Sequence, residues 1–339
     1  MTNKFLYNKY LPLKESEIIG QTHIKKILNN LIIENKLPCN YIFHGKHGTG
    51  KTAYSKIFFN KINCKKDHIK KICNCTLNKS SIDFLEIDAA SHRKVEEIKE
   101  FFKRRVFLPL THTYRVICID EAQMLSIYSF NYLLKIIENE NKRLIIIFIT
   151  TQFKKIPNTI KSRCLCLNFK KIKPNVLLKH LIYITLQEKV ALKKTIIRII
   201  AKNSQGSVRK ALVQLELIIA YKAKTRKQAY KVLEIPTKKI VHLSIKKILN
   251  CSNINELLTF INTAINNIDN YTHYLKALIK KITKLITKNI ITSKTTHNKK
   301  LKIIRNTLLT ELQKHAYIPL TKINIYLGLL TSFIKVRTL

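Results

Sequence analysis

Apolar runs of strand length alternate with amphipathic stretches along the first half of the chain. Residues that favour β-structure gather at positions 40–45, 84–89, 115–122 and 144–151. Helical spacing of apolar residues marks positions 51–62, 94–106 and 129–140. Short buried strands that alternate with helices are typical of a parallel sheet with helices on both faces. The pattern therefore predicts an α/β domain for this half.

Beyond about Lys173 the strand signal fades and helical spacing takes over. Helices are predicted at positions 175–189, 193–204 and 207–223, and the whole chain from about Pro236 is predicted to be helical. An apolar stripe at i, i+3, i+4 spacing runs through this tail and comprises Leu275, Leu278, Ile279, Ile282, Leu285 and Ile286. Such a stripe serves ordinary core packing or an oligomer interface, and both interpretations stay open.

Basic residues dominate the charge of the chain. Lysine and arginine outnumber aspartate and glutamate by 63 to 20 in 339 residues, which gives a formal net charge of +43. A charge this far from neutral indicates a polyanionic partner, most simply nucleic acid. A gene rich in A and T is the alternative explanation, because Lys, Asn and Ile crowd every part of the chain. The two are compatible, since a surface made basic by coding bias can still bind DNA.

No segment has the character of a membrane span or a secretory signal. The start of the chain lacks a continuous apolar core, and no run of about 18 apolar residues occurs. The eight cysteines are scattered, and several stand in apolar strands. Reduced thiols fit this distribution better than a disulfide framework. We therefore expect a cytoplasmic protein.

The stretch FHGKHGTGKTAYSKIF carries a phosphate-binding pattern. It fits G-x-x-x-x-G-K-T through Gly45, Lys46, His47, Gly48, Thr49, Gly50, Lys51 and Thr52. Small residues let backbone N–H groups turn inward around a phosphate, and the following helix adds its dipole. Lys51 can reach the β and γ phosphates, and Thr52 can place its hydroxyl on Mg²⁺. The alternative, a chance glycine-rich turn, is disfavoured because the stretch stands between a strand and a helix.

A second candidate lies where the run VICIDEAQ reaches Asp120 and Glu121. P-loop ATPases need a carboxylate near Mg²⁺, which suits Asp120. A second carboxylate one residue on can polarise the attacking water, so Glu121 is the candidate general base. An Asp-Glu pair at a strand end is a weak signal alone, because it can be a capping pair. Combined with the upstream pattern it favours a hydrolase over a small-molecule kinase.

Four further positions can complete a hydrolysis site. Thr150 and Thr151 end the run LIIIFITT, where a hydroxyl can hydrogen-bond the γ-phosphate or the water, although both can also be ordinary strand-end residues. Arg163 stands just before the apolar CLCLNF, and an arginine on a surface edge can reach a neighbour's γ-phosphate in trans. Arg209, in GSVRKAL, can fold over the nucleotide from a second domain. Taken singly, each arginine is more often solvated than functional.

Assembled in order, these motifs resemble the γ/τ subunit family of bacterial DNA polymerase III, the motor of the sliding-clamp loader. The resemblance rests on IIGQTHIKKIL, YIFHGKHGTGKT, LEIDAASHRKVEEIKE, RVICIDEAQMLSIYSFNYLLKIIE, IPNTIKSRC and GSVRKAL. It extends from Leu11 to Ala220, and the remainder matches only in position and helical character. It implies an AAA+ P-loop domain over residues 1–171, a helical lid domain with the second sensor over 172–235, and an all-helical collar and oligomerisation domain over 236–339.

The resemblance also implies an ATPase within the DNA-directed DNA polymerase holoenzyme, with ATP and Mg²⁺ bound. By this resemblance, Lys51 and Thr52 bind phosphate and Mg²⁺, and Asp120 and Glu121 form the second nucleotide-binding motif. Thr151 is the implied first sensor, and Arg209 is the implied second sensor. Arg163 is the implied arginine finger that acts on the neighbouring subunit. The implied partners are other clamp-loader subunits in a pentameric spiral, the sliding clamp and primer-template DNA, in a nucleoid-associated complex. Ser91, Arg93 and Lys94 stand where the family meets DNA.

The chain departs from the family pattern in a zinc module and in length. The family has four cysteines after the P-loop helix, whereas residues 64–75 supply Cys64, Cys73 and Cys75, with C-x-C in place of C-x-x-C. Structural zinc is normally bound by four ligands in a tetrahedral arrangement. His68 can be the fourth, so a Zn²⁺ site stays open. Without a Pro-rich linker or τ-specific domains, the chain resembles a short γ-like form.

Three alternatives remain beside the clamp-loader motor. Another AAA+ DNA motor, such as a branch-migration helicase, is disfavoured by the SRC and EIDAAS motifs. A structural clamp-loader subunit without ATPase activity loses the P-loop, whereas Lys51, Thr52, Asp120 and Glu121 are present here. A basic nucleic-acid binder with a decayed ATPase is disfavoured by the presence of the same four residues.

Overall fold

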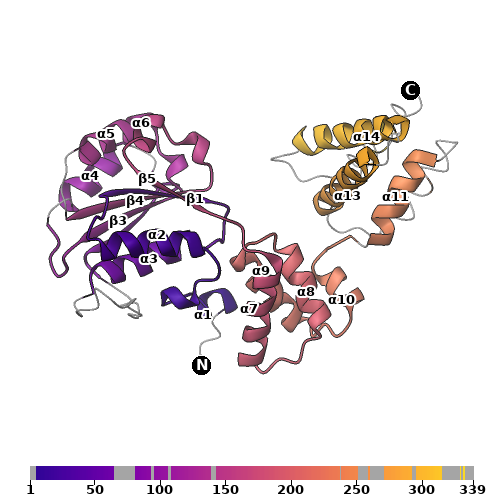
Figure 1. Ribbon diagram of the computed structural model, residues 1–339, viewed down its shortest axis with the longest axis horizontal. Helices are drawn as coiled ribbons and strands as arrows, with labels where there is room; N and C mark the ends of the chain where they lie inside the picture. The colour runs from indigo at the N-terminus through magenta and orange to yellow at the C-terminus, as the bar shows by residue number, and fades with distance from the viewer. Residues whose placement is uncertain are drawn as a thin grey trace. The chain divides into compact units, whose positions relative to one another are not determined.

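The computed structural model describes residues 5–64, 81–92, 95–105, 108–138, 143–236, 238–250, 259, 271–291, 295–314, 329 and 331–332. The chain divides into two compact units, Met1–Ala220 and Tyr221–Leu339. Within the described residues, strands occur in the first unit, and the second is built from helices (Figure 1).

Five strands of the described residues form one parallel sheet in the order β2-β3-β4-β1-β5. They are β1 (Asn40–Gly45), β2 (Phe84–Asp88), β3 (Arg115–Asp120), β4 (Leu144–Thr150) and β5 (Leu165–Phe169). All of β4 is buried, as expected for an inner strand covered on both faces. The edge strand β5 instead has exposed residues between buried ones. The predicted parallel sheet is confirmed, and β5 adds a strand that the pattern did not assign.

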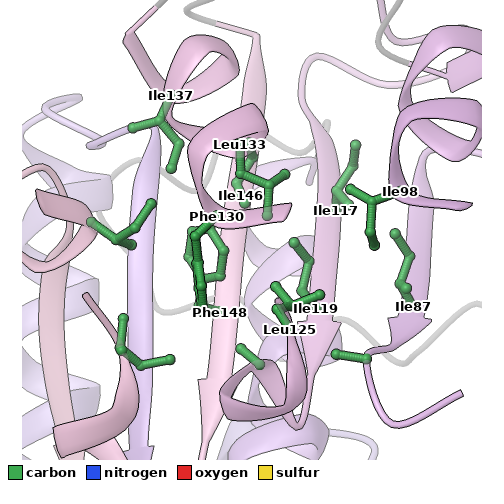
Figure 2. Close-up of a cluster of buried hydrophobic side chains, with 14 of the residues drawn as sticks. Ile87, Ile98, Ile117, Ile119, Leu125, Phe130, Leu133, Ile137, Ile146 and Phe148 are labelled. Atoms are coloured by element: carbon green, nitrogen blue, oxygen red, sulfur yellow. The ribbon is translucent and has the colours of Figure 1, made fainter. Parts of the chain in front are cut away.

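Helices cover both faces of this sheet (Figure 1). One face carries α2 (Thr22–Ile33) and α3 (Lys51–Ile62), and the other carries α4 (Val95–Arg105), α5 (Ile127–Glu138) and α6 (Asn158–Lys161). Figure 2 shows Phe130, Leu133 and Ile137 of α5 against Ile146 and Phe148 of β4. Close-packed layers on both faces hold the strands, and therefore the loops that follow them, in fixed positions.

The first unit also contains short elements and three further helices. These are α1 (Leu6–Lys9), η1 (Glu15–Glu17), η2 (Ala122–Met124), η3 (Phe153–Lys155), α7 (Pro174–Gln187), α8 (Lys194–Asn203) and α9 (Val208–Ala220). Pro174 begins α7, where its missing N–H breaks no helical hydrogen bond. The helices α7, α8 and α9 contact one another, and α1 contacts α9. The amino-terminal segment is thereby tied to the end of this unit.

The second unit contains helices in every described stretch longer than three residues beyond position 236. Its helices are α10 (Arg226–Val232), α11 (Lys238–Asn250), α13 (Tyr271–Ile291) and α14 (Thr295–Lys314). Leu275, Leu278 and Ile282 of the predicted stripe are fully buried. Since α13 contacts both α11 and α14, the stripe serves core packing. None of the helices described is long and apolar enough to cross a membrane.

A buried carboxylate anchors the amino ends of β2 and β3. The Asp83 side chain is fully buried and accepts hydrogen bonds from the N–H groups of Leu110 (2.9 Å), Thr111 (2.8 Å) and His112 (3.0 Å). Arg115 Nη2 donates to Asp83 Oδ1 at 3.0 Å. Burial by itself raises the pKa of Asp83, but the donors, led by the N–H groups of Leu110 and Thr111, outweigh it and lower the pKa.

We expect Asp83→Ala to reduce the free energy of unfolding by about 3–5 kcal/mol, because it removes the carboxylate that faces a buried guanidinium. The exposed Asp88 is the matched control, and Asp88→Ala should cost under about 1 kcal/mol. Since the folded pKa of Asp83 is depressed, its contribution is present above the unfolded value of about 4 and is lost as the pH falls below it. Urea unfolding from pH 7 down to pH 3 measures both effects. Equal losses for the two variants would contradict the anchoring role.

Candidate functional site

The carboxyl ends of three adjacent strands bring the predicted phosphate site together. β1 ends at Gly45, β3 at Asp120 and β4 at Thr150. β4 lies between β3 and β1, and its Thr150 pairs with His44. Ligands commonly bind at this edge of parallel sheets, because the loops after the strands meet there.

The loop from Gly45 to Gly50 approaches its neighbours so closely that two positions require glycine. A Cβ on Gly45 would lie 2.3 Å from the carbonyl oxygen of Phe169, and one on Gly48 would lie 2.2 Å from Ser207 Oγ. Gly48 also has a φ of +69°, which other residues adopt at a cost. The loop leads into α3, whose first N–H groups are suited to an anion.

Lys51 and Thr52 begin α3 and face the loop and β3. Lys51 is 6% exposed, and its Nζ donates to the carbonyl oxygens of Gly45 (2.8 Å) and Lys46 (2.9 Å). Burial lowers the pKa of Lys51, against the opposing effect of Asp120 and Glu121. Thr52 Oγ1 donates to Asp120 Oδ2 at 2.8 Å. A hydroxyl and a carboxylate are hard oxygen ligands, so this pair fits Mg²⁺.

Glu121 has an unusual backbone conformation, and two side chains contact its carboxylate. Its φ of 49° and ψ of 40° are left-handed values that cost a residue other than glycine about 1–3 kcal/mol and gather at functional sites. Its Oε1 lies 3.4 Å from His47 Nδ1, and its Oε2 accepts a hydrogen bond from Gln123 Nε2. Thr151 Oγ1 lies 3.4 Å from the same nitrogen of Gln123. The candidate base and the predicted first sensor therefore share one amide.

The start of α9 closes on the phosphate-binding loop within the first unit. Val208 N donates to the carbonyl oxygen of Gly48 at 2.9 Å. The guanidinium carbon of Arg209 lies 5.2 Å from the centre of the Tyr7 ring, a cation–π contact. Lys9 Nζ pairs with Glu188 just after α7, and the Tyr10 hydroxyl donates to the same carboxylate. The amino-terminal segment thus contacts both α9 and the end of α7.

Most of the residues at this edge line one pocket of about 360 Å³, whereas Gln123 and Thr151 are not among its lining residues. Its polar end holds the loop, the two carboxylates and Arg209, and its other walls come from the amino-terminal segment and from α7 and α9. The lining includes His47–Ala53, Asp120, Glu121, Arg209, Tyr7, Tyr10, Leu11, Pro12, Ile18, His180 and Leu212. A polar end beside an apolar wall suits a ligand with phosphates and a flat apolar ring.

Arg163 lies at the opposite end of the sheet from this pocket. It precedes β5, whose Leu165 pairs with Tyr41 near the start of β1, whereas Gly45 pairs with Phe169 at the far end. The length of β5 separates these ends by roughly 15 Å. The Arg163 side chain is 43% exposed, and its Nε lies 3.0 Å from Glu138 Oε1. This position excludes contact with a phosphate on its own loop and leaves the guanidinium accessible to another chain.

The predicted DNA and zinc residues are only partly described. Ser91 is exposed in the turn after β2, and its hydroxyl donates to Asp88 Oδ2 at 3.1 Å. Arg93 and Lys94 lie outside the described residues, as do His68, Cys73 and Cys75, while Cys64 is half-buried just past α3. Among the residues that the structure describes, no group of three or more His, Cys, Asp or Glu side chains could hold a metal ion. The DNA contacts and the Zn²⁺ site stay predictions.

Two parts of the site escaped the motif analysis. The amino-terminal wall at Tyr7 and Tyr10 has no motif, and aromatic residues near a chain terminus are too common to single out. Gln123 stands in the run VICIDEAQ without a role of its own, although an amide two residues after a candidate base is a usable signal. Both become visible only when distant segments are brought together.

Residues 20–173 match the family model described as "DNA polymerase III, delta subunit". The chain is 36% identical over 285 residues to the DNA polymerase III subunit gamma/tau of Mycoplasma genitalium, which covers 81% of this chain and 48% of that protein. It is 37% identical over 227 residues to the subunit tau of Bacillus subtilis, covering 65% of this chain and 40% of that protein. The chain thus spans about half the length of these relatives, or less.

Solved structures agree on the fold. The Thermotoga maritima RuvB Holliday junction branch migration motor superposes with a TM-score of 0.52 at 17% identity, covering 78% of this chain and 90% of that one. This likeness identifies the AAA+ fold, a five-stranded parallel sheet with helices followed by a helical region, and nothing more specific. By its identity to the gamma and tau subunits, the chain belongs to the DNA polymerase III gamma/tau clamp-loader family.

Proposed function

We propose that the chain is an ATP-hydrolysing motor subunit of a clamp loader, which loads a sliding clamp onto primer-template DNA. The observation that carries this proposal is the convergence of Lys51, Thr52, Asp120, Glu121 and Arg209 on one pocket. A subunit that only braces an assembly needs none of these groups. The matched relatives are DNA polymerase III gamma and tau subunits, which favours replication as the setting.

In the proposed reaction, ATP and water give ADP and phosphate. The loop N–H groups and Lys51 hold the β and γ phosphates, while Leu11 and Pro12 face the base. Mg²⁺, when bound beside Thr52 and Asp120, neutralises charge that develops on the phosphates. Glu121 orients and polarises the attacking water. Thr151 senses the γ-phosphate, and Arg209 reaches the nucleotide from the side of α9.

The neighbouring subunit completes the proposed site. Arg163 of one chain reaches the γ-phosphate held by the next, because it lies far from its own pocket and exposes its guanidinium. Such an arrangement fits a spiral of five subunits. Residues 172–235 act as its lid and 236–339 as its collar. Ser91, Arg93 and Lys94 face DNA, with the net charge of +43 as support. A Zn²⁺ ion near Cys64 remains a separate proposal.

A non-hydrolysing clamp-loader subunit is the second candidate. The match of residues 20–173 to the delta-subunit model favours it. The same segment, however, contains the full set of Lys51, Thr52, Asp120 and Glu121. The motor is therefore the better supported of the two.

ATP hydrolysis by the purified chain tests the choice, measured alone and with partner subunits, primed DNA and a sliding clamp. We expect weak activity alone and stimulation that requires both the clamp and primed DNA. DNA binding without hydrolysis under any combination would establish the structural subunit instead. Stimulation by DNA that is indifferent to the clamp would indicate a different AAA+ motor.

A further inference from the structure

A chain of hydrogen bonds connects the end of β4 to Glu121 through one side chain, Gln123. Thr150 is fully buried, and its Oγ1 donates to Gln123 Oε1 at 2.6 Å. On the other side of the amide, Gln123 Nε2 donates to Glu121 Oε2 and lies 3.4 Å from Thr151 Oγ1. Gln123 itself belongs to η2, the short helix that directly follows Glu121.

The orientation of this amide follows from its partners at both ends. Thr150 Oγ1 already accepts a hydrogen bond from Gln152 N at 3.1 Å, so its single proton is available for Gln123 Oε1. A flipped amide would turn its oxygen toward the Glu121 carboxylate, and two acceptors would then face each other. The Glu121 end therefore requires the nitrogen to face the carboxylate, and the Thr150 hydroxyl is compatible with that orientation.

We propose that Gln123 is a positioning residue, whose amide holds the Glu121 carboxylate in place for the attacking water and couples it to Thr150 and Thr151. This inference rests on the proposed ATPase function and deepens it. The charged groups that otherwise surround Glu121 are His47, Lys51 and Asp120. Within the described residues, Gln123 is the side chain that contacts both the carboxylate and the end of β4. A phosphate contact at Thr151 is thereby transmitted to Glu121.

Two replacements of equal length separate this role from simple packing. Gln123→Met removes every polar contact, whereas Gln123→Glu keeps an acceptor for Thr150 but removes the donor to Glu121. We expect both to lower kcat about tenfold or more, because a general base contributes about 10²–10⁴-fold. The KM for ATP should change less than about twofold, since neither variant touches the phosphate-binding loop. Gln187→Met, an exposed position at the end of α7, is the control and should retain wild-type kcat.

A double-mutant cycle in the assembled complex tests whether Gln123 acts through Glu121. In a Glu121→Gln background, Gln123→Met should reduce the remaining rate less than about twofold. Normal kcat in Gln123→Met, or reductions that multiply in the double variant, would overturn the positioning role alone. Absence of hydrolysis by the wild-type complex would overturn the proposed function and this role together. Thermal unfolding of each variant, expected well above the assay temperature, separates the loss of rate from misfolding.

Discussion

Replacing Lys51 with alanine is expected to weaken ATP binding about 100-fold and to remove measurable hydrolysis. A charge-assisted hydrogen bond to phosphate contributes about 1.5–3 kcal/mol, and about 1.4 kcal/mol corresponds to tenfold in affinity. Lys51 is well placed for such a bond, because burial and two carbonyl contacts hold its amine inside the loop. Titration with a fluorescent ATP analogue measures the affinity, and steady-state phosphate release measures the rate.

Lys56→Ala on the same helix provides the matched control for Lys51→Ala. Lys56 carries the same side chain but pairs with Glu86 at 2.7 Å, at the partly exposed side of α3. Its loss should leave ATP affinity unchanged and cost under about 1 kcal/mol of stability. An affinity for ATP within twofold of wild type in Lys51→Ala would contradict the assignment of the loop as the phosphate site.

Sequence patterns identify those parts of the site whose functional residues lie close together in the sequence. The glycine-rich loop, Lys51 and Thr52 occupy one continuous segment between a strand and a helix, and Asp120 and Glu121 end another buried run. Parallel strands then place both segments at one edge of the sheet, as their alternation with helices predicts. Local pattern and global fold agree here, so these residues could be predicted to lie together.

The parts that patterns did not identify depend on tertiary contacts. β5 is an edge strand of five residues with exposed Cys166 and Asn168, and its hydrogen bonds to β1 outweigh its weak local preference. Tyr7 reaches the pocket only because α1 contacts α9, about two hundred residues away in sequence. The role of Gln123 becomes visible only through its hydrogen bond with Thr150, which lies at the end of β4. Such contacts between distant segments cannot be predicted from the spacing of residues in the sequence.

Replacing Arg163 with alanine is expected to leave ATP binding intact and to lower hydrolysis by the assembled complex about 10³-fold or more, the usual worth of an arginine finger. The protein should remain folded, because Arg163 is partly exposed and a surface ion pair with Glu138 contributes under about 1 kcal/mol. Glu138→Ala is the matched control, since it breaks the same ion pair but keeps the guanidinium. It should hydrolyse ATP at close to the wild-type rate.

Mixing two inactive variants distinguishes a finger in trans from a finger in cis. A Lys51→Ala chain keeps Arg163 but cannot hold ATP, and an Arg163→Ala chain holds ATP but lacks the finger. If copies of the chain are neighbours, the mixed assembly recovers part of the hydrolysis that each variant lacks alone, because one chain supplies the guanidinium to the other chain's nucleotide. The position of Arg163 just before the start of β5, at the edge of the sheet opposite the phosphate-binding loop, requires this outcome for an arginine that acts in catalysis. Normal hydrolysis by a complex in which every copy is Arg163→Ala would show that the residue is only a surface partner of Glu138.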